Sequence, residues 1–240
     1  MSGPIPPVRA VTLDFYQTLV DHRAGIGRGR ALMEYLEAHG LRSAPWEHQV
    51  LYDVLGRHDT EYDPKAPREE RERYYRRLAR RLFRRLEVAA PIEEADRRAS
   101  DVWELVGPAS LVVFDDVPGA LVALEDAGYP LAVVSNWQRG LTHFCAELGL
   151  AEHFDHVLAS AEVGSQKPDP GIFLEACRRL GVPPSGVVQV GDGVVDDIEG
   201  GRGAGVRVVL MLRGEASPPP DVTTVSSLAE LPPLLASWTP

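Results

Sequence analysis

The sequence predicts an α/β fold, in which a Rossmann-like parallel sheet forms the core and a helical cap is inserted into it. In the second half of the chain, short apolar runs alternate with helical segments, a pattern that gives parallel sheets with helices on both faces. One further apolar run, residues 8–15, stands near the N-terminus and is followed by a long helical stretch. We therefore expect a core of residues 1–20 and 108–240, with a cap of residues 21–107.

Composition limits the class of protein. The chain has 240 residues, enough for one domain with an inserted subdomain, and its net charge of −10 disfavours binding to nucleic acid. It lacks an apolar run that could span a membrane, and residues 1–7 do not resemble a signal peptide. Cys145 and Cys177 fall in predicted helices, as reduced core thiols do. We expect a cytoplasmic protein that acts on a small molecule, without a nucleic-acid or membrane partner, as a monomer or a homodimer.

The predicted cap contains four helical segments. They cover residues 30–39, 46–55, 68–87 and 92–106. In the third, an apolar stripe consists of Tyr75, Leu78, Ala79, Leu82, Phe83 and Leu86. Its other positions carry Arg73, Arg76, Arg77, Arg80, Arg81, Arg84 and Arg85. We interpret these arginines as a solvated, salt-bridged face, and the alternative is a wall that attracts anions above an active site.

The second half of the chain supplies the rest of the core. Strands are predicted at residues 129–135, 156–160, 186–190 and 207–212. Helices are predicted at residues 118–127, 141–148, 170–180, 197–204 and 228–238. Because the carboxyl ends of parallel strands meet at one edge, residues that follow these strands are expected to lie close together.

Reactive side chains stand at those strand ends. Asp14, Ser135 and Asp192 each follow an apolar run, and Lys167 lies in a loop that leads to a helix on the same edge. Taken singly, each stretch is a common turn or helix entry. Taken together, in this order and each at a strand end, they predict a catalytic site.

The acidic residues predict a cation. Asp14, Asp192, Asp196 and Asp197 would repel one another without a bound ion or proton, and oxygen ligands of this kind suit Mg²⁺. Such an ion neutralises a phosphate and lets an anionic nucleophile approach it. Asp14 is then the nucleophile that forms an aspartyl-phosphate. Lys167 and Ser135 stabilise the transferring group, and Thr18 orients the loop after the nucleophile.

These stretches resemble the four motifs of the haloacid dehalogenase-like (HAD) hydrolase superfamily, and the resemblance covers the whole chain. It implies a HAD-like core, with the helical insertion as a C1 cap. The catalytic residues that it implies are Asp14, Ser135, Lys167 and Asp197. The metal ligands that it implies are Asp14, the backbone carbonyl of Tyr16, Asp192 and Asp196.

Three further residues are expected to contact the substrate. Thr18 and Asn136 belong to this set by their place beside the first two motifs. Arg23, with His22 beside it, follows the first motif at the entrance to the cap. For Arg23 and His22 a solvated loop is an equal alternative.

Tyr16 departs from the phosphatases of the superfamily, which carry a second aspartate at this position as general acid and base. The metal site tolerates the change because it uses only the backbone carbonyl. Loss of general acid–base catalysis costs about 10²–10⁴-fold in rate, or roughly 3–5 kcal/mol. An alkyl phosphate would lose most of this factor, whereas an acyl or aryl phosphate would lose less.

A tyrosine at this position resembles the 2-haloacid dehalogenase branch, in which a halide leaves without a proton. Those metal-free enzymes, however, carry Ser where this chain has Asp192 and Asn where it has Val194. An extra carboxylate without a metal would repel a haloacid. We therefore favour a Mg²⁺-dependent phosphatase acting on a small phosphorylated substrate, ahead of a metal-free dehalogenase. A non-catalytic HAD-fold binding module comes third, because Asp14, Lys167 and Asp192 are intact.

Overall fold

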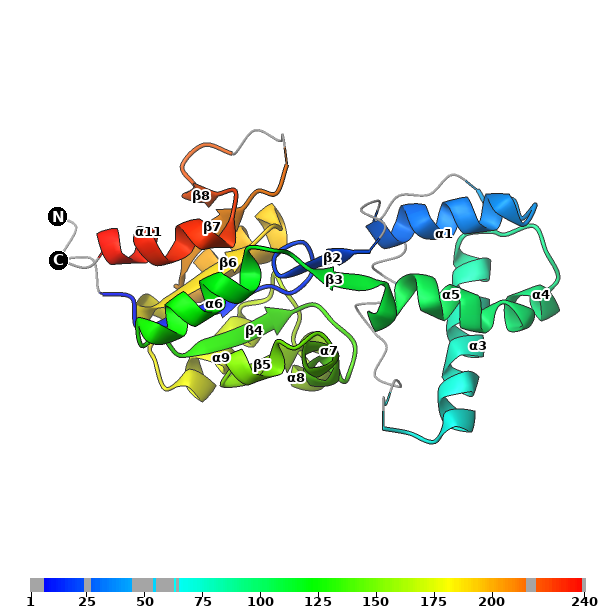
Figure 1. Cartoon of the computed structure of the whole chain (residues 1–240), viewed down its shortest axis with the longest axis horizontal. Helices are drawn as coiled ribbons and strands as arrows, with labels where there is room; N and C mark the ends of the chain where they lie inside the picture. The colour runs from blue at the N-terminus through cyan, green and yellow to red at the C-terminus, as the bar shows by residue number, and fades with distance from the viewer. Residues whose placement is uncertain are drawn as a thin grey trace.

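The computed structural model describes residues 7–23, 27–44, 54, 63, 65–214 and 219–238. Figure 1 shows two parts side by side, a sheet with its flanking helices and a group of helices beyond the carboxyl ends of the strands. The helices of the second part lie between residues 27 and 106, within the stretch expected to form the cap.

The first part is built on a six-stranded parallel sheet, which confirms the predicted α/β class. Its strand order is β5-β4-β1-β6-β7-β8. The strands are β1 (Ala10–Leu13), β4 (Leu131–Ser135), β5 (His156–Ala159), β6 (Val187–Gly191), β7 (Arg207–Met211) and β8 (Thr224–Val225). The N-terminal strand therefore lies in the middle of the sheet, where both its faces are covered, as its apolar sequence requires.

The strand register brings the predicted site residues to one edge. Leu13 pairs with Val133 of β4 and with Val190 of β6. Asp14 follows Leu13 directly, and Ser135 closes β4. The carboxyl ends of β1, β4 and β6 thus deliver their next residues to neighbouring positions, facing the helical part.

Helices cover both faces of the sheet. Val11 and Leu13 pack in one apolar cluster with α6, α7 and α11, whereas Ala10 packs in a second cluster with α9 and α10. This alternation along β1 is the two-residue period of a strand buried on both sides. The core helices are α6 (Val117–Asp126), α7 (Leu141–Glu147), α8 (Ser160–Val163), α9 (Pro170–Leu180), α10 (Gly200–Ala204) and α11 (Leu231–Ser237).

The helical part contains α1 (Gly27–Ala38), α3 (Arg68–Arg85), α4 (Ile92–Arg97) and α5 (Ala99–Val106). The single helix expected over residues 92–106 is broken at Arg98, whose backbone lies at φ −100° and ψ 7°. The helix expected over residues 46–55 falls outside the described residues except for Val54. On α3 the aromatic residue of the apolar stripe is Tyr74, which is more deeply buried than Tyr75.

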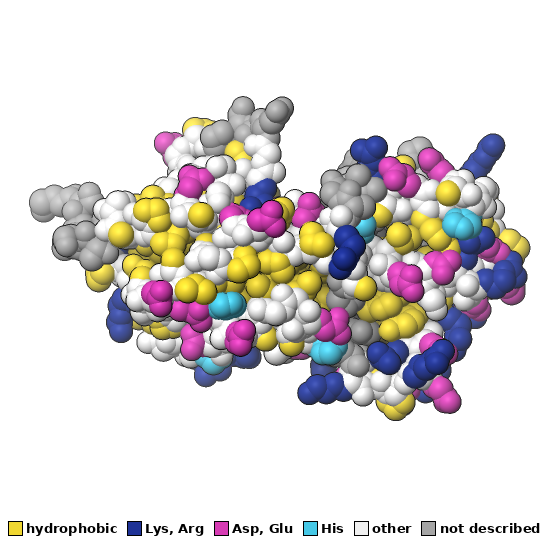
Figure 2. Space-filling model, in the orientation of Figure 1, with side chains coloured by type: hydrophobic (Ala, Val, Ile, Leu, Met, Phe, Trp, Pro, Cys, Tyr) yellow, Lys and Arg dark blue, Asp and Glu magenta, His cyan; other side chains and the backbone are white. Residues whose placement is uncertain are grey.

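The seven arginines expected on the solvated face of α3 are exposed, as that interpretation predicts, whereas Arg71 is half-buried. Figure 2 shows basic side chains gathered over the helical part, while apolar side chains are frequent on the core at this face. The ion pairs of α3 include Arg68 with Glu72, Arg73 with Glu70, and Arg80 with Asp96 of α4.

An antiparallel pair that the sequence did not predict joins the two parts. It consists of β2 (Val20–His22) and β3 (Leu111–Val113), which carry the chain out of the core and back into it (Figure 1). β2 crosses the predicted cap boundary at residue 20, and β3 lies just beyond the one at residue 107. Strands of three residues leave too short an alternation to recognise in a sequence.

The chain after β6 is also more irregular than expected. A π-helical segment, Val194–Glu199, precedes α10, where the sequence predicts one short helix over residues 197–204. Such wide turns are frequent at functional sites, and this one carries the acidic residues of the fourth motif. Among the described residues, none of the helices combines the length and the apolar character that a membrane crossing requires.

Candidate active site

A buried lysine joins two carboxylates at the carboxyl edge of the sheet. Lys167 Nζ donates hydrogen bonds to Asp14 Oδ1 and to Asp197 Oδ1, each at 2.6 Å. Lys167 and Asp197 are each 1% exposed, and Asp14 is 5% exposed. A buried ammonium ion requires such partners, so this arrangement fixes both the lysine and the carboxylates.

A chain of hydrogen bonds from the strands holds Asp197. Gln189 Nε2 donates to Asp197 Oδ1 at 2.9 Å, and the backbone N–H of Gly193 donates to Asp197 Oδ2 at 3.0 Å. Thr12 Oγ1 in turn donates to Gln189 Oε1 at 2.6 Å, from β1 to β6. We did not single out Thr12 or Gln189 from the sequence. Their signal is a polar residue inside an otherwise apolar buried strand.

The glycine that precedes Asp192 makes room for this carboxylate. A Cβ atom at Gly191 would lie 2.1 Å from Asp197 Cγ, a distance that no side chain can tolerate. The Gly–Asp pair at the end of β6 is therefore a steric requirement of the site as well as a turn.

Three carboxylates converge on this point. Asp14, Asp192 and Asp197 offer ligand atoms that all lie within 4.8 Å of one another. Asp192 is exposed as a residue, yet desolvation of its carboxyl by the surrounding protein, and then the charges of Asp14 and Asp197, raise its pKa well above 3.8. Burial likewise raises the pKa of Asp197 to about 6, although Lys167 opposes the shift. One ammonium does not balance three carboxylates, so the site has an excess of negative charge.

These groups line a cleft of about 140 Å³. Its lining residues are Asp14, Tyr16, Lys167, Asp192, Gly193, Asp196 and Asp197. The cleft is much smaller than the roughly 300–1,000 Å³ of sites for drug-sized ligands. Its size suits a group such as a phosphoryl group, with the remainder of a substrate outside it.

The two polar residues of the second motif, Ser135 and Asn136, have different surroundings. Ser135 is 1% exposed and closes β4 at the edge where Asp14 follows β1. Asn136 is fully buried and pairs with the backbone of Lys167. Its Nδ2 donates to Lys167 O at 2.9 Å, and Lys167 N donates to its Oδ1 at 2.7 Å. Asn136 therefore positions the lysine, and its contact with a substrate stays a prediction.

Asp196 and Asp197 differ in their surroundings. Asp196, expected as a metal ligand, lines the cleft but lies outside the group of three converging carboxylates. It accepts a hydrogen bond from Asn136 Nδ2 at 3.3 Å. Asp197, expected as a catalytic residue and not among the metal ligands, lies inside the group. A π-helical turn sets the directions of these adjacent side chains, and spacing in the sequence does not reveal that geometry.

The other expected substrate contacts do not line the cleft. Thr18 is fully buried and its Oγ1 has no partner among the described residues. Arg23 is exposed, and its Nε donates to Ala109 O at 3.3 Å. His22 is buried in β2, with Nε2 3.0 Å from Leu105 O. His22 and Arg23 connect the two ends of the helical part, and none of the three residues lines the cleft.

A residue that sequence reasoning missed fixes the loop after the nucleophile. Arg213 donates to Thr18 O from Nε and Nη2, at 3.2 and 2.9 Å, and to both oxygens of Asp116 from Nη1, at 3.0 and 3.1 Å. Asp116 Oδ2 also accepts hydrogen bonds from Ser227 Oγ and from the N–H of Leu228. The first motif, the segment returning from β3 and the C-terminal region are thereby held together.

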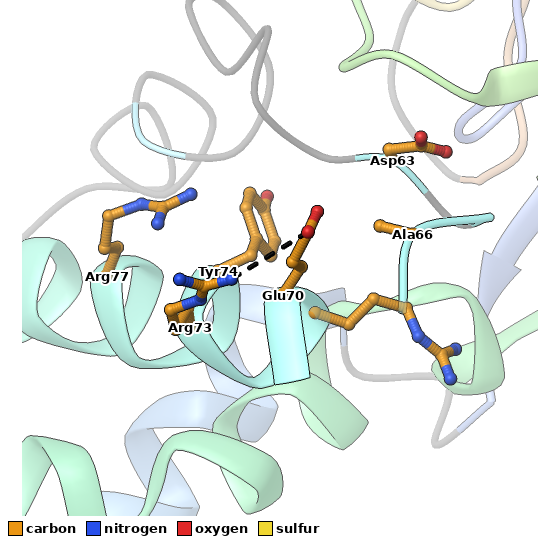
Figure 3. A pocket seen from close by; sticks show the side chains of 7 residues that line it. Asp63, Ala66, Glu70, Arg73, Tyr74 and Arg77 are labelled. Atoms are coloured by element: carbon orange, nitrogen blue, oxygen red, sulfur yellow. Dashed lines mark ion pairs between the residues drawn. The ribbon is translucent and has the colours of Figure 1, made fainter. Parts of the chain in front are cut away.

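A second hollow, of about 190 Å³, lies on α3 (Figure 3). Its lining residues are Asp63, Ala66, Glu70, Arg71, Arg73, Tyr74 and Arg77. Arg73 and Glu70 form an ion pair there at 3.9 Å. This hollow shares no residue with the acidic cleft, so the basic residues of α3 do not supply the charge that the carboxylates lack.

The fold and the cleft define an α/β enzyme core with an aspartate, a lysine and further carboxylates at the strand ends. The sequence pattern of the haloacid dehalogenase-like hydrolase family matches residues 8–205. The chain belongs to this family and is a hydrolase.

Relatives extend over almost the whole chain. Haloacid dehalogenase-like hydrolase domain-containing protein 3 of Danio rerio is 30% identical over 236 residues, which cover 94% of this chain and 96% of that protein. Glyceraldehyde 3-phosphate phosphatase of Methanopyrus kandleri is 32% identical over 216 residues, which cover 87% and 85%. The 2-haloacid dehalogenase structure from Pseudomonas syringae pv. Tomato DC3000 has a TM-score of 0.62 and 28% identity, and covers 97% of this chain and 100% of that chain. Both a phosphatase and a dehalogenase are therefore similar to this protein.

Proposed function

We propose that this hydrolase is a Mg²⁺-dependent phosphatase that acts on a small phosphorylated substrate with Asp14 as its nucleophile. The observation that carries the proposal is the convergence of Asp192 and Asp197 on Asp14, within 4.8 Å. A nucleophilic carboxylate needs no further carboxylates to displace a halide, whereas a phosphatase uses them to hold a cation.

The residues present fit a magnesium ion. All three converging groups are carboxylates, the hard oxygen donors that Mg²⁺ prefers. Desolvation, and then the charges of Asp14 and Asp197, raise the pKa of Asp192, and a bound cation would offset both. Asp14, Asp192 and the backbone carbonyl of Tyr16 would hold the ion. For the remaining acidic position the contacts favour Asp197 over Asp196. When bound, the ion would neutralise phosphate charge that otherwise repels Asp14.

The protein's own side chains then carry out the transfer of the phosphoryl group. Asp14 Oδ attacks phosphorus, the bond from phosphorus to the leaving oxygen breaks, and the electron pair departs with that oxygen. The ammonium of Lys167 offsets negative charge beside Asp14, and Asn136 keeps the lysine there. The hydroxyl of Ser135 would donate a hydrogen bond to a phosphoryl oxygen. Water then attacks the aspartyl-phosphate, releases phosphate and restores Asp14.

Relatives support the same class of reaction. Besides the enzyme of Methanopyrus kandleri, a glyceraldehyde 3-phosphate phosphatase of Methanothermobacter thermautotrophicus is 28% identical over 85% of this chain. The proposal includes a small-molecule partner, a cytoplasmic location and a monomer or homodimer. The two free, buried cysteines support the cytoplasmic location, and the net charge of −10 disfavours a nucleic-acid partner.

A metal-free dehalogenase is the second candidate. Tyr16 favours it, because the general acid of a phosphatase is missing, and so does the similarity to the dehalogenase structure. Asp192 opposes it, since an uncompensated carboxylate beside Asp14 would repel a haloacid.

One set of assays separates these candidates. We expect hydrolysis of p-nitrophenyl phosphate with Mg²⁺, loss of this activity in EDTA, and no release of halide from 2-chloropropionate. Asp14→Asn should abolish the hydrolysis, whereas Glu152→Gln, at an exposed position outside the cleft, should not change it. Metal-independent halide release would overturn the proposal, and absence of turnover with either substrate would favour the binding module.

A further inference from the structure

A buried arginine from the helical part reaches the catalytic loops of the core. Arg28 lies in the first turn of α1, which begins beside β2, and is only 7% exposed. Its guanidinium carbon is 4.5 Å from the ring centroid of Tyr16 and 4.7 Å from that of Trp137. Its Nη1 donates to Val106 O, at the end of α5, at 3.3 Å. One cation thus contacts two aromatic rings of the core and both ends of the helical part.

The two rings belong to the first two catalytic motifs. Tyr16 stands two residues after Asp14 and lines the acidic cleft, and Trp137 stands two residues after Ser135. Trp137 is 3% exposed and packs edge to face against Phe15, with ring centroids 5.1 Å apart. Because Trp137 is held in the core, Arg28 links the Tyr16 ring to an anchored ring.

Tyr16, held against Arg28, stands at the position where phosphatases of the family carry the aspartate that donates a proton to the leaving group. A leaving alcohol needs a proton as its bond to phosphorus breaks, and a phenol held against a guanidinium differs from the carboxylic acid that usually supplies it. Arg28 is buried and contacts both rings, so water screens its charge weakly, and cation–π contacts of this buried kind are strong.

We propose that Arg28 is a specificity-determining positioning residue that, through Tyr16, restricts this site to phosphates whose leaving group departs as a stable anion. The substrate class is acyl or aryl phosphates, which release a carboxylate or a phenolate. The bond between phosphorus and the leaving oxygen breaks, its electron pair stays on that oxygen, and no proton is transferred. The nearby positive charge favours this anion. The inference rests on the phosphatase function proposed above.

Selectivity among leaving groups tests the inference. With Mg²⁺ present, kcat/KM is measured for acetyl phosphate, for a series of substituted phenyl phosphates and for an alkyl phosphate. Such substrates differ in intrinsic reactivity, so wild type is compared with Tyr16→Asp on the same series. For each protein, the kcat/KM for the acyl or aryl substrates is divided by the kcat/KM for the alkyl substrate. We expect this ratio to be about 10²–10⁴-fold higher in wild type than in Tyr16→Asp.

Three further variants locate the effect. Arg28→Met should steepen the dependence of kcat on leaving-group pKa and slow the poorer phenols by about tenfold, roughly the low end of an electrostatic effect. Arg28→Lys should recover part of the rate, since it keeps the charge but not the planar stacking. Tyr16→Phe should behave as wild type, which shows that the phenol is not the acid. Arg30→Met, an exposed residue of the same helix, is the matched control.

The outcomes distinguish this inference from the function on which it rests. If wild type hydrolyses no phosphate, the proposed function fails. If wild type hydrolyses phosphates with the same selectivity as Tyr16→Asp, or if both Arg28 variants keep the wild-type dependence on leaving-group pKa, the inference fails alone. A slope that changes only with Tyr16→Phe would also overturn it. The melting temperature and the Mg²⁺ affinity of each variant, measured by calorimetry, show whether its structure is intact. If Arg28→Met does not fold, Arg28→Lys is used for the test instead.

Discussion

The charged residues of the strand ends and those of α3 have opposite environments. Lys167 is buried and shared by two buried carboxylates, whereas the seven arginines of α3 between Arg73 and Arg85 are exposed. Exposed ion pairs contribute little because water screens them, while a buried charge that loses its partner is strongly destabilising. A run of seven arginines is therefore weaker evidence of function than one lysine in a Lys-Pro-Asp-Pro sequence.

Removing the buried charge should have the largest effect. Lys167→Met keeps much of the side-chain volume but leaves Asp14 and Asp197 without their shared ammonium. We expect kcat/KM for p-nitrophenyl phosphate to fall by about 10²–10³-fold. The free energy of unfolding should fall by about 3–5 kcal/mol without metal, because buried carboxylates lose their partner. Steady-state kinetics and urea unfolding measure the two effects, and a variant as active as wild type would contradict this role.

Removing the contacts of Asn136 should have the next largest effect. Asn136→Ala removes two buried hydrogen bonds to the Lys167 backbone and leaves its N–H and carbonyl unsatisfied. We expect a loss of about 1–3 kcal/mol in the free energy of unfolding, with a lower kcat and little change in KM. A rise in KM at unchanged kcat would instead restore Asn136 as a substrate contact.

A smaller, partly buried network lies behind the first motif. Arg213→Met removes the hydrogen bonds to Thr18 O and Asp116, and should cost about 1–3 kcal/mol of unfolding free energy. Because the loop after Asp14 loses a support, kcat should fall more than stability alone explains. Unfolding and kinetics of Arg213→Met, with Arg202→Met as an exposed control, measure this effect.

The same network predicts a dependence on pH. Desolvation raises the pKa of Asp116, but hydrogen bonds from Ser227, Arg213 and Leu228 prevail and hold it below 3.8. A carboxyl with a depressed pKa in the folded state stabilises the protein above the unfolded pKa, and this contribution is lost as pH falls through the folded one. Wild type should therefore exceed Asp116→Asn in stability at pH 7, and the gap should narrow below pH 3.8. Urea unfolding across this range measures it, and a gap that widens in acid would refute the assignment.

The exposed pairs should show the smallest effect. Arg80 pairs with Asp96 across α3 and α4, but both side chains are solvated. Arg80→Ala should leave kcat/KM unchanged and shift the melting temperature very little, because exposed pairs are screened. A large loss of activity would revive the alternative in which the arginines of α3 form an anion-attracting wall.

The sequence was sufficient for the features that follow local rules. The apolar strands predicted the parallel sheet, and the order of Asp14, Ser135, Lys167 and Asp192 predicted their shared edge. Contacts between different segments of the chain could not be predicted from the sequence. Neither the approach of Arg213 to Thr18 nor that of Arg28 to Tyr16 leaves a periodic pattern in the sequence, because each depends on how two separate segments pack. The three-residue strands β2 and β3 were missed because they are too short to show alternation.

The central claim is that Asp14 accepts a phosphoryl group at a site that a divalent cation completes. Mass spectrometry of the peptide containing Asp14, after rapid acid quenching during turnover, tests it directly. We predict a phosphorylated Asp14 with acetyl phosphate or p-nitrophenyl phosphate and Mg²⁺, and none in EDTA. An ester of Asp14 formed from 2-chloropropionate without metal, or no phosphorylation of Asp14 while phosphate is released, would contradict the account.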